Sequence, residues 1–222
     1  VLDMVGFPQR SRYHCYDVWE HTLHALAQVP PELELRLTML LHDIGKPGCC
    51  TIDASGCGHF KGHPARSAAL AEEMLRRLRA DNATRETVVR LVAWHDRNIP
   101  RTRPGVASAL RQLGETDLRR LLCIKRADNL AQDPAYRAMQ EEIGRAETIL
   151  DRLLAEGACV SLDQLAVRGG DLLALGLSGP AVGETLEALL DAVIEERLPN
   201  DRAVLLEYAR RRCGKVPGGE KL

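Results

Sequence analysis

The spacing of apolar residues along the chain predicts a series of helices separated by proline- and glycine-rich breaks. Apolar side chains recur every three or four residues in most segments, which is the period of an amphipathic helix. Within residues 32–42, for example, they form a stripe of Leu33, Leu37, Leu40 and Leu41. Helices are therefore expected over residues 17–28, 32–42, 65–79, 84–95, 106–113, 117–130, 134–156, 171–175, 181–195 and 201–212.

Residues that start or stop helices support these boundaries. Gly45 and Pro47 are expected to end the second helix, and Asn200 to cap the last one. Ser161 and Gln164 have the spacing of a capping box. The expected buried faces are Val18, His21, Leu23 (or Thr22) and Ala25 in the first helix, and Ala138, Ile143, Ala146, Ile149, Leu150 and Leu153 in the helix over residues 134–156.

This pattern predicts an all-α fold with two domains. Residues 48–62 are the exception: they contain four glycines and three cysteines, and only Thr51-Ile52 has a strand-like pattern. Gly157 ends the long helix and marks the expected domain boundary. We expect a helical bundle over residues 1–157, a small C-terminal helical domain over residues 158–213 and a disordered tail over residues 214–222.

Composition is typical of a soluble globular protein. The 222 residues are 45% apolar and 27% charged, and with only two Phe, two Trp and four Tyr the core must be built from Leu, Ala and Val. A net charge of −1 argues against a strongly basic nucleic-acid binder, although local basic patches are compatible with it. No apolar run reaches the ~20 residues that span a membrane. Seven cysteines and no visible signal peptide make a reducing cytoplasm the expected location.

Polar residues at helix ends and on apolar helices carry the main candidate chemistry. His42 and Asp43 are adjacent at the end of an apolar helix, while further histidines and an aspartate lie in other segments. Burying such groups without partners is costly, so a bound metal ion explains them better. Imidazole and carboxylate suit Mn, Fe, Ni or Zn, whereas Mg prefers oxygen ligands alone. The candidate metal ligands are His21, His42, Asp43, His63, His95 and Asp128.

The order of these ligands resembles the HD superfamily of metal-dependent phosphohydrolases. Residues 8–21, 59–63 and 169–173 narrow the match, because they are similar to the HD domain and tail of bacterial CCA-adding enzymes. These enzymes are tRNA nucleotidyltransferases, also called polynucleotide adenylyltransferases. The resemblance covers about residues 8–212. It implies an HD-type helical bundle that hydrolyses a nucleotide or an RNA-end phosphate, such as a 2′,3′-cyclic or 2′-phosphate ester.

The resemblance leaves open whether the site holds one divalent ion or two. His21, His42, Asp43 and Asp128 are the expected ligands of the first ion. HD proteins of this type often complete a second site with two further histidines, and the spacings to His63 and His95 fit that pattern, with Asp43 as the bridging ligand. Two ions would clamp a phosphate and activate a water molecule as the nucleophile. The alternative is a single ion, with these two histidines supporting the ligands or contacting substrate.

Three further residues are candidates for contacting a phosphate substrate. Lys46 follows Asp43 by three residues, so it is expected to neutralise developing charge and to share the catalytic role with Asp43. The alternative is a lysine favoured by the dipole at a helix C-terminus. His59 and Lys61 are weaker candidates for substrate binding. The cysteines of residues 48–62 lack the C-x-x-C spacing of a zinc site, so an ordinary loop is expected there.

The C-terminal region suggests contact with RNA. Residues 176–179 are similar to the turn of a helix-hairpin-helix, whose backbone amides can bind a phosphate. The residues alone favour a tight turn between packed helices, whereas the family resemblance favours a contact with tRNA. A basic face lies nearby, formed by Arg202, Arg210, Arg211, Arg212 and Lys215.

Three functional hypotheses follow. The first is a metal-dependent phosphohydrolase acting on a nucleotide or phosphate ester. No nucleotidyltransferase activity is expected from this chain alone, because nothing in it matches the polymerase head of CCA-adding enzymes. The second is a non-catalytic body and tail that binds tRNA. The third is a nucleotidase for small molecules with no RNA role. The sequence leaves the oligomeric state open.

Overall fold

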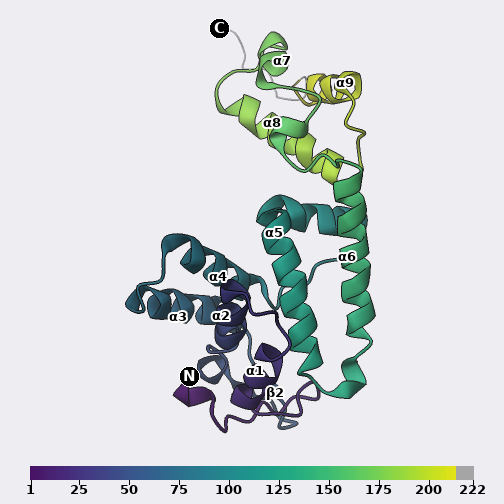
Figure 1. Ribbon diagram of the computed structural model, residues 1–222. Helices are drawn as coiled ribbons and strands as arrows, with labels where there is room; N and C mark the ends of the chain where they lie inside the picture. The colour runs from purple at the N-terminus through teal and green to yellow at the C-terminus, as the bar shows by residue number, and fades with distance from the viewer. Residues whose placement is uncertain (214–222) are drawn as a thin grey trace. The chain divides into compact units, whose positions relative to one another are not determined.

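The computed structural model describes residues 1–213 and consists almost entirely of helices (Figure 1). Its α-helices are α1 (Val18–Leu26), α2 (Leu33–Leu41), α3 (His63–Arg77), α4 (Asn82–Trp94), α5 (Arg103–Leu130), α6 (Met139–Ala155), α7 (Gly169–Ala174), α8 (Pro180–Ile194) and α9 (Arg202–Cys213). Short 3-10 helices are η1 (Leu2–Met4), η2 (Pro47–Cys49), η3 (Pro134–Tyr136) and η4 (Leu162–Gln164). The strands β1 (Thr51–Ile52) and β2 (Gly58–His59) pair antiparallel in a hairpin. The predicted all-α fold is confirmed.

The chain divides into two compact units. The first unit contains Val1–Ile99 and Leu113–Thr148, and the second contains Pro100–Gln112 and the chain from Ile149 onward. The predicted domain boundary at Gly157 stays a prediction, and the predicted disordered tail lies outside the described residues. None of the described helices is both long and apolar enough to cross a membrane.

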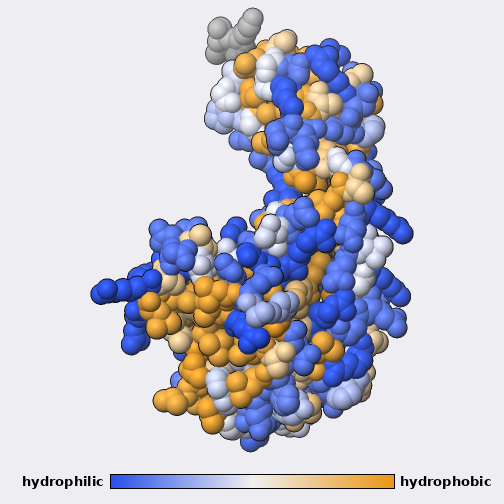
Figure 2. Space-filling view, viewed as in Figure 1, coloured by the Kyte–Doolittle hydropathy of each residue, from blue (hydrophilic) through white to orange (hydrophobic). Residues whose placement is uncertain are grey.

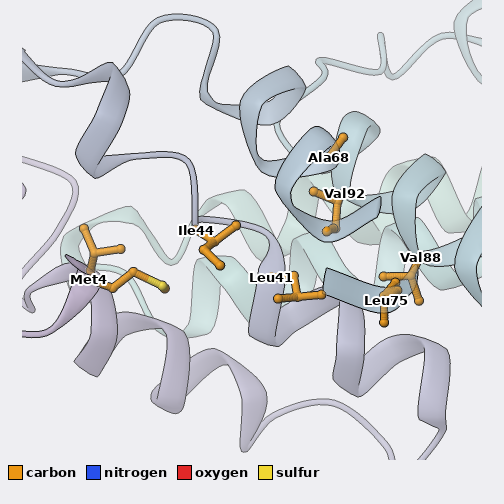
Figure 3. Packing of buried hydrophobic residues seen from close by; sticks show 9 residues of the cluster. Met4, Leu41, Ile44, Ala68, Leu75, Val88 and Val92 are labelled. Atoms are coloured by element: carbon orange, nitrogen blue, oxygen red, sulfur yellow. The ribbon is translucent and has the colours of Figure 1, made fainter. Parts of the chain in front are cut away.

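One hydrophobic cluster of the first unit lies mainly between helices α2, α3 and α4 (Figure 3). Its buried members are Met4, Val18, Leu41, Ile44, Ala68, Ala71, Leu75, Val88 and Val92. Partly buried apolar residues, among them Trp19, Leu40 and Met74, pack against this cluster from outside, and Figure 2 shows apolar side chains at the surface of this part of the chain. Because Leu41 and Ile44 are both anchored in the core, the two residues between them are held in a fixed position.

The predicted apolar stripe of α2 is only partly correct. Leu41 is buried as predicted, but Leu33 at the helix start is 60% exposed. The fully buried positions include Leu35 and Thr38, because α2 packs against neighbours on more than one side. For the position of α1 at which Leu23 or Thr22 was expected to be buried, the structure buries Thr22 and not Leu23. Its hydroxyl is satisfied by donating to the Val18 carbonyl.

The two helices expected over residues 106–113 and 117–130 both lie within α5, which consists of two helices joined at a kink at Gly114, so the predicted break between them is confirmed. Gly114 has a φ of 74°, a left-handed conformation that glycine adopts without steric cost. The long helix expected over residues 134–156 is instead η3 followed by α6, because Asp133 caps the Ala135 N–H and a turn intervenes. Ala138 lies in that turn and is exposed, whereas Ile143, Ala146, Leu150 and Leu153 are buried and Ile149 is half-buried.

Asn200 does not cap the last helix. Its side chain accepts from the Ala166 N–H and donates to the Gln164 carbonyl, so it joins the η4 segment to the start of α9. The cap is Asp201, whose carboxylate accepts from the Val204 backbone. The predicted capping box of η4 is confirmed.

Asp17 caps α1, which carries one of the candidate ligands. Its carboxylate accepts the Glu20 N–H at 2.8 Å and the Gly6 N–H at 3.1 Å. We expect Asp17→Ala to lower the free energy of unfolding by about 1 kcal/mol, which is typical for loss of an N-cap. Urea denaturation measures the effect, with Asp3→Ala at an exposed position as the control. Equal midpoints for the two variants would contradict the capping role.

Candidate metal centre

The end of α2 brings His42 and Asp43 into the interior of the first unit. Both residues continue the helical turn after Leu41, and the Asp43 carbonyl accepts the Lys46 N–H at 2.9 Å. The His42 and Asp43 side chains are almost completely buried. The His42 Nδ1 lies 2.7 Å from the Met39 carbonyl, which can only accept, so Nδ1 carries the proton and Nε2 faces Asp43.

The other three histidines are oriented in the same way. Each directs Nδ1 at a backbone carbonyl: His21 at Ala131 (3.3 Å), His63 at Phe60 (2.9 Å) and His95 at Val92 (2.7 Å). Each therefore presents Nε2 as a bare lone pair to the interior. Histidines that ligate metals are usually held by such a hydrogen bond from the second ring nitrogen.

The Asp43 carboxylate lies between two groups of side chains. Its Oδ2 is 3.2 Å from His42 Nε2 and 3.6 Å from His21 Nε2. Its Oδ1 is 3.3 Å from His63 Nε2 and 3.6 Å from His95 Nε2. Two sets of ligand atoms close enough to hold an ion thus share Asp43: His21, His42 and Asp43, and Asp43, His63 and His95.

Asp128 is at the edge of the first group. Its Oδ1 is 2.9 Å from His21 Nε2 and 3.9 Å from His42 Nε2, and its side chain is 22% exposed. The structure therefore brings together all six predicted metal ligands, which we call the six-residue cluster.

A divalent transition metal fits the six-residue cluster. The Nε2 atoms of His21 and His42 and both carboxylate oxygens of Asp43 are buried without a well-directed hydrogen bond, even though charged groups lie close to them. The Nε2 atoms of His63 and His95 face each other at 3.1 Å, and two lone pairs repel at that distance unless a cation or proton lies between them. Native structures rarely leave buried polar atoms unsatisfied, so these atoms indicate a ligand. Imidazole and carboxylate are suitable donors for such an ion.

The charges of the cluster shift the pKa values of its members. Burial would raise the pKa of Asp43, but its electrostatic interactions with the neighbouring His42 and Lys46 hold that pKa well below its usual value. Burial also opposes ionisation of Asp128, and its interaction with the neighbouring His21 lowers its pKa. Both carboxylates are therefore ionised at neutral pH and available as ligands.

A cavity of about 490 Å³ opens onto the cluster and contains the predicted substrate contacts. Lys46, His59 and Lys61 all line it, and Lys46 Nζ is 2.7 Å from Asp43 Oδ2. His59 is engaged elsewhere: its ring is 55% exposed, and Nε2 is 2.6 Å from Asp53 Oδ2 on the hairpin. Lys61 is exposed at the mouth of the cavity.

Sequence reasoning missed several residues of this cavity and of the shell that supports it. The cavity lining also includes Ser11, Tyr13, His14, Asp96 and Gln132, and Gln9 lies behind Lys46. Burial lowers the pKa of His14 to about 3, helped by the nearby Lys46 charge, so this ring is neutral. These residues lie on irregular segments without periodicity. The family-like character of residues 8–21 was a signal for the residues within that segment but not for Asp96 or Gln132.

The three cysteines of residues 48–62 do not come together in one group of potential ligands. The hairpin gathers Asp53, Cys57 and His59, whereas Cys49 and Cys50 are not part of that group. The Asp53 carboxylate already accepts hydrogen bonds from the Ser55 and Cys57 backbone N–H groups, which close the hairpin turn. A structural role in the turn thus accounts for Asp53.

Comparison with known proteins connects the chain to tRNA nucleotidyltransferases. Residues 65–209 match the family model tRNA nucleotidyltransferase domain 2. The chain is 35% identical to the CC-adding tRNA nucleotidyltransferase of Thermus thermophilus, over 97% of this chain and 50% of the relative. It is 33% identical to the A-adding tRNA nucleotidyltransferase of Deinococcus radiodurans, over 81% of this chain and 43% of the relative. It is 31% identical to the multifunctional CCA protein of Thioalkalivibrio sulfidiphilus, over 83% and 44%. The chain spans about half the length of the curated relatives that it matches.

Proposed function

Since the chain belongs to the tRNA nucleotidyltransferase domain 2 family, we propose that it is the tRNA-binding body and tail of a tRNA nucleotidyltransferase-like protein. The names of its relatives, which describe addition of C or A to tRNA, support this proposal. We further propose that the six-residue cluster is a metal-dependent phosphohydrolase site of the HD type within that body. The two functions are compatible, and they rest on different observations.

The second unit offers a surface suited to an RNA backbone. The turn between α7 and α8 contains Gly176 and Gly179, both with positive φ, and it is exposed before the first turn of α8. The basic residues Arg210, Arg211 and Arg212 are exposed on the last turn of α9. Exposed arginines and open helix N-termini are the groups that bind phosphates in RNA.

We expect replacement of Arg210, Arg211 and Arg212 by alanine to weaken tRNA binding by about tenfold or more at low salt. The slope of log affinity against log salt should fall by up to ~3, about one for each lost phosphate contact. Fluorescence anisotropy with labelled tRNA at several salt concentrations measures both quantities.

A matched control removes the same charge from the first unit, by replacing the exposed residues Arg76, Arg77 and Arg79 with alanine. If the control weakens binding as much as the α9 variant, net charge and not the α9 surface determines the affinity. If the wild-type chain fails to bind tRNA at low salt, the proposal of a tRNA-binding body is wrong.

One observation carries the phosphohydrolase proposal. In four histidines Nδ1 faces a backbone carbonyl, and the four Nε2 atoms converge on one buried carboxylate. His21, His42, Asp43 and Asp128 would hold one ion, and His63 and His95 with Asp43 a second. A divalent metal there would polarise a phosphate and lower the pKa of a bound water. Lys46 supplies a positive charge at the wall of the cavity, whose volume suits a nucleotide or a phosphate ester at an RNA end.

Elemental analysis of the purified chain tests this proposal. About two equivalents of Mn, Fe, Ni or Zn are expected, and about one equivalent would assign His63 and His95 to substrate contact. No bound metal after supplying these ions would overturn the proposal. Hydrolysis of nucleoside 2′,3′-cyclic phosphate and of 2′-phosphate esters is then compared with hydrolysis of tRNA carrying the same ends. A preference for free nucleotides that the α9 variant leaves unchanged would favour a small-molecule nucleotidase.

A further inference from the structure

The ammonium group of Lys46 lies among three polar side chains. Lysine is seldom buried unless it is paired, yet Lys46 is only 5% exposed. Its Nζ is 2.7 Å from Asp43 Oδ2, 2.8 Å from Gln9 Oε1 and 3.5 Å from His14 Nε2. The contact with Asp43 is an ion pair and the contact with Gln9 is a hydrogen bond, while His14 lies at the distance limit of a third contact. Lys46 therefore has one position at the wall of the cavity, although its side chain has four rotatable bonds.

Gln9 accepts a hydrogen bond from Lys46, and its own orientation is determined. The residue is 2% exposed, and its Nε2 lies 3.3 Å from the Tyr16 carbonyl and 3.5 Å from the Asp17 carbonyl. If the amide were flipped, its oxygen would face these two carbonyls and its NH₂ would face the ammonium. Both contacts would be repulsive, so Oε1 must point to Lys46.

The backbone that carries Gln9 is supported by the hairpin. The Gly58 N–H donates to the Arg10 carbonyl at 2.9 Å. A Cβ at Gly58 would lie 2.3 Å from the Gln9 carbonyl oxygen, which is closer than any real Cβ contact. Only glycine allows strand β2 to approach so closely, and this approach holds the Gln9 segment against the cavity.

We propose that Gln9 is a positioning residue that fixes the Lys46 ammonium beside Asp43, so that its charge faces a phosphate bound in the cavity. This role rests on the proposed phosphohydrolase function, but the fixed geometry of Lys46 can be tested without it. Gln9 acts through Lys46 and makes no contact with substrate. Because the ammonium is paired with Asp43 and hydrogen-bonded to Gln9, Lys46 acts by its charge and its position.

Acetylation of lysines in the full chain tests the geometry directly. Gln9→Met keeps the length of the side chain but removes both the acceptor and the donors. We expect the rate of Lys46 acetylation, followed by mass spectrometry, to rise about threefold to tenfold, the equilibrium shift of one lost hydrogen bond. The exposed Lys61 on the same cavity should react at an unchanged rate, and the surface variant Gln28→Met should leave both rates unchanged. An unchanged Lys46 rate in Gln9→Met overturns the proposal.

A second variant and a second readout separate this inference from the proposed function. Gly58→Ala must displace the Gln9 backbone, so it should also raise the Lys46 rate, and it keeps the proposal testable if Gln9→Met does not fold. With a 2′,3′-cyclic phosphate substrate, Gln9→Met should lower kcat/KM about threefold to tenfold at unchanged metal content. A loss of metal in Gln9→Met would mean that Gln9 supports the ligands and would overturn the positioning role. If the wild type neither binds metal nor hydrolyses the ester, the phosphohydrolase function fails, while the acetylation rates still decide the role of Gln9.

Discussion

Asp43→Asn is expected to abolish metal binding by the chain and, with it, phosphate-ester hydrolysis. Asp43 is the one side chain shared by both candidate ion sites, so its loss affects them together. Replacing a group that merely supports a ligand costs up to about 100-fold in metal affinity or activity, and loss of a shared ligand should cost at least that much. The measurements are metal equivalents by elemental analysis and kcat/KM with a 2′,3′-cyclic phosphate.

The substitution also removes the charge that balances Lys46. Breaking a buried ion pair from one side typically costs about 3–5 kcal/mol, so the variant should be less stable as well as metal-free. Metal content must therefore be measured on protein shown by circular dichroism to be folded.

Asp53→Asn is the matched control for Asp43→Asn. Asp53 belongs to the other group of potential ligands, on the exposed hairpin with Cys57 and His59. This control should retain its metal and its activity, apart from a small loss of stability in the hairpin turn. If Asp53→Asn loses the metal and Asp43→Asn keeps it, the hairpin is the metal site and the proposed function of the six-residue cluster is wrong.

Residue type and order were sufficient to predict which side chains meet in the cluster. A histidine and an aspartate on apolar helices have few stable alternatives to a shared site, and the resemblance indicated that His63 and His95 would complete a second ion site. The structure shows why the prediction could go this far: each of the four histidines follows or lies within a helix whose apolar neighbours determine its direction. The roles of these residues, as distinct from their positions, stay predictions.

Residues that act through backbone contacts could not be predicted from the sequence. Gln9 lies in an irregular segment, and its role depends on Lys46, which is 37 positions away in the chain. Leu33 was expected in the core because periodicity gives the spacing of an apolar face but not the number of neighbours that a short helix has. Asn200 was expected to cap a helix because its type favours caps, yet it pairs with a segment about 35 residues earlier.

Gly45 is another residue whose role depends on a contact that the sequence does not reveal. Its residue type and place predict only the end of a helix. Its φ is not positive, so it is not the left-handed residue that commonly ends a helix. Glycine is required at this position because the backbone of α3 approaches it closely. A Cβ at Gly45 would lie 2.7 Å from the Ser67 nitrogen and 2.9 Å from the His63 carbonyl oxygen, and both atoms belong to the backbone of α3. The Gly45 N–H also donates to Ser67 Oγ at 2.9 Å.

Gly45→Ala is therefore expected to push the start of α3 away from the end of α2. His63 is the first residue of α3, and its Nε2 is 3.3 Å from Asp43 Oδ1, so the displacement separates the two halves of the cluster. We expect a loss of about 1–3 kcal/mol in the free energy of unfolding, as for other overpacked sites. We also expect kcat/KM to fall about 100-fold, the effect of moving a reacting group by about 1 Å. Urea denaturation and hydrolysis assays measure these two effects.

Gly144→Ala makes the same chemical change in a helix with free space. The nearest atom to a Cβ at Gly144 is Arg126 Nη2 at 4.0 Å, so the added methyl group meets no backbone. Alanine is the better helix former by about 1 kcal/mol, so this variant should be slightly more stable and fully active. The two substitutions should thus change stability in opposite directions. If Gly45→Ala is as stable and as active as Gly144→Ala, the contact between α2 and α3 can yield without moving His63, and it does not determine the geometry of the cluster.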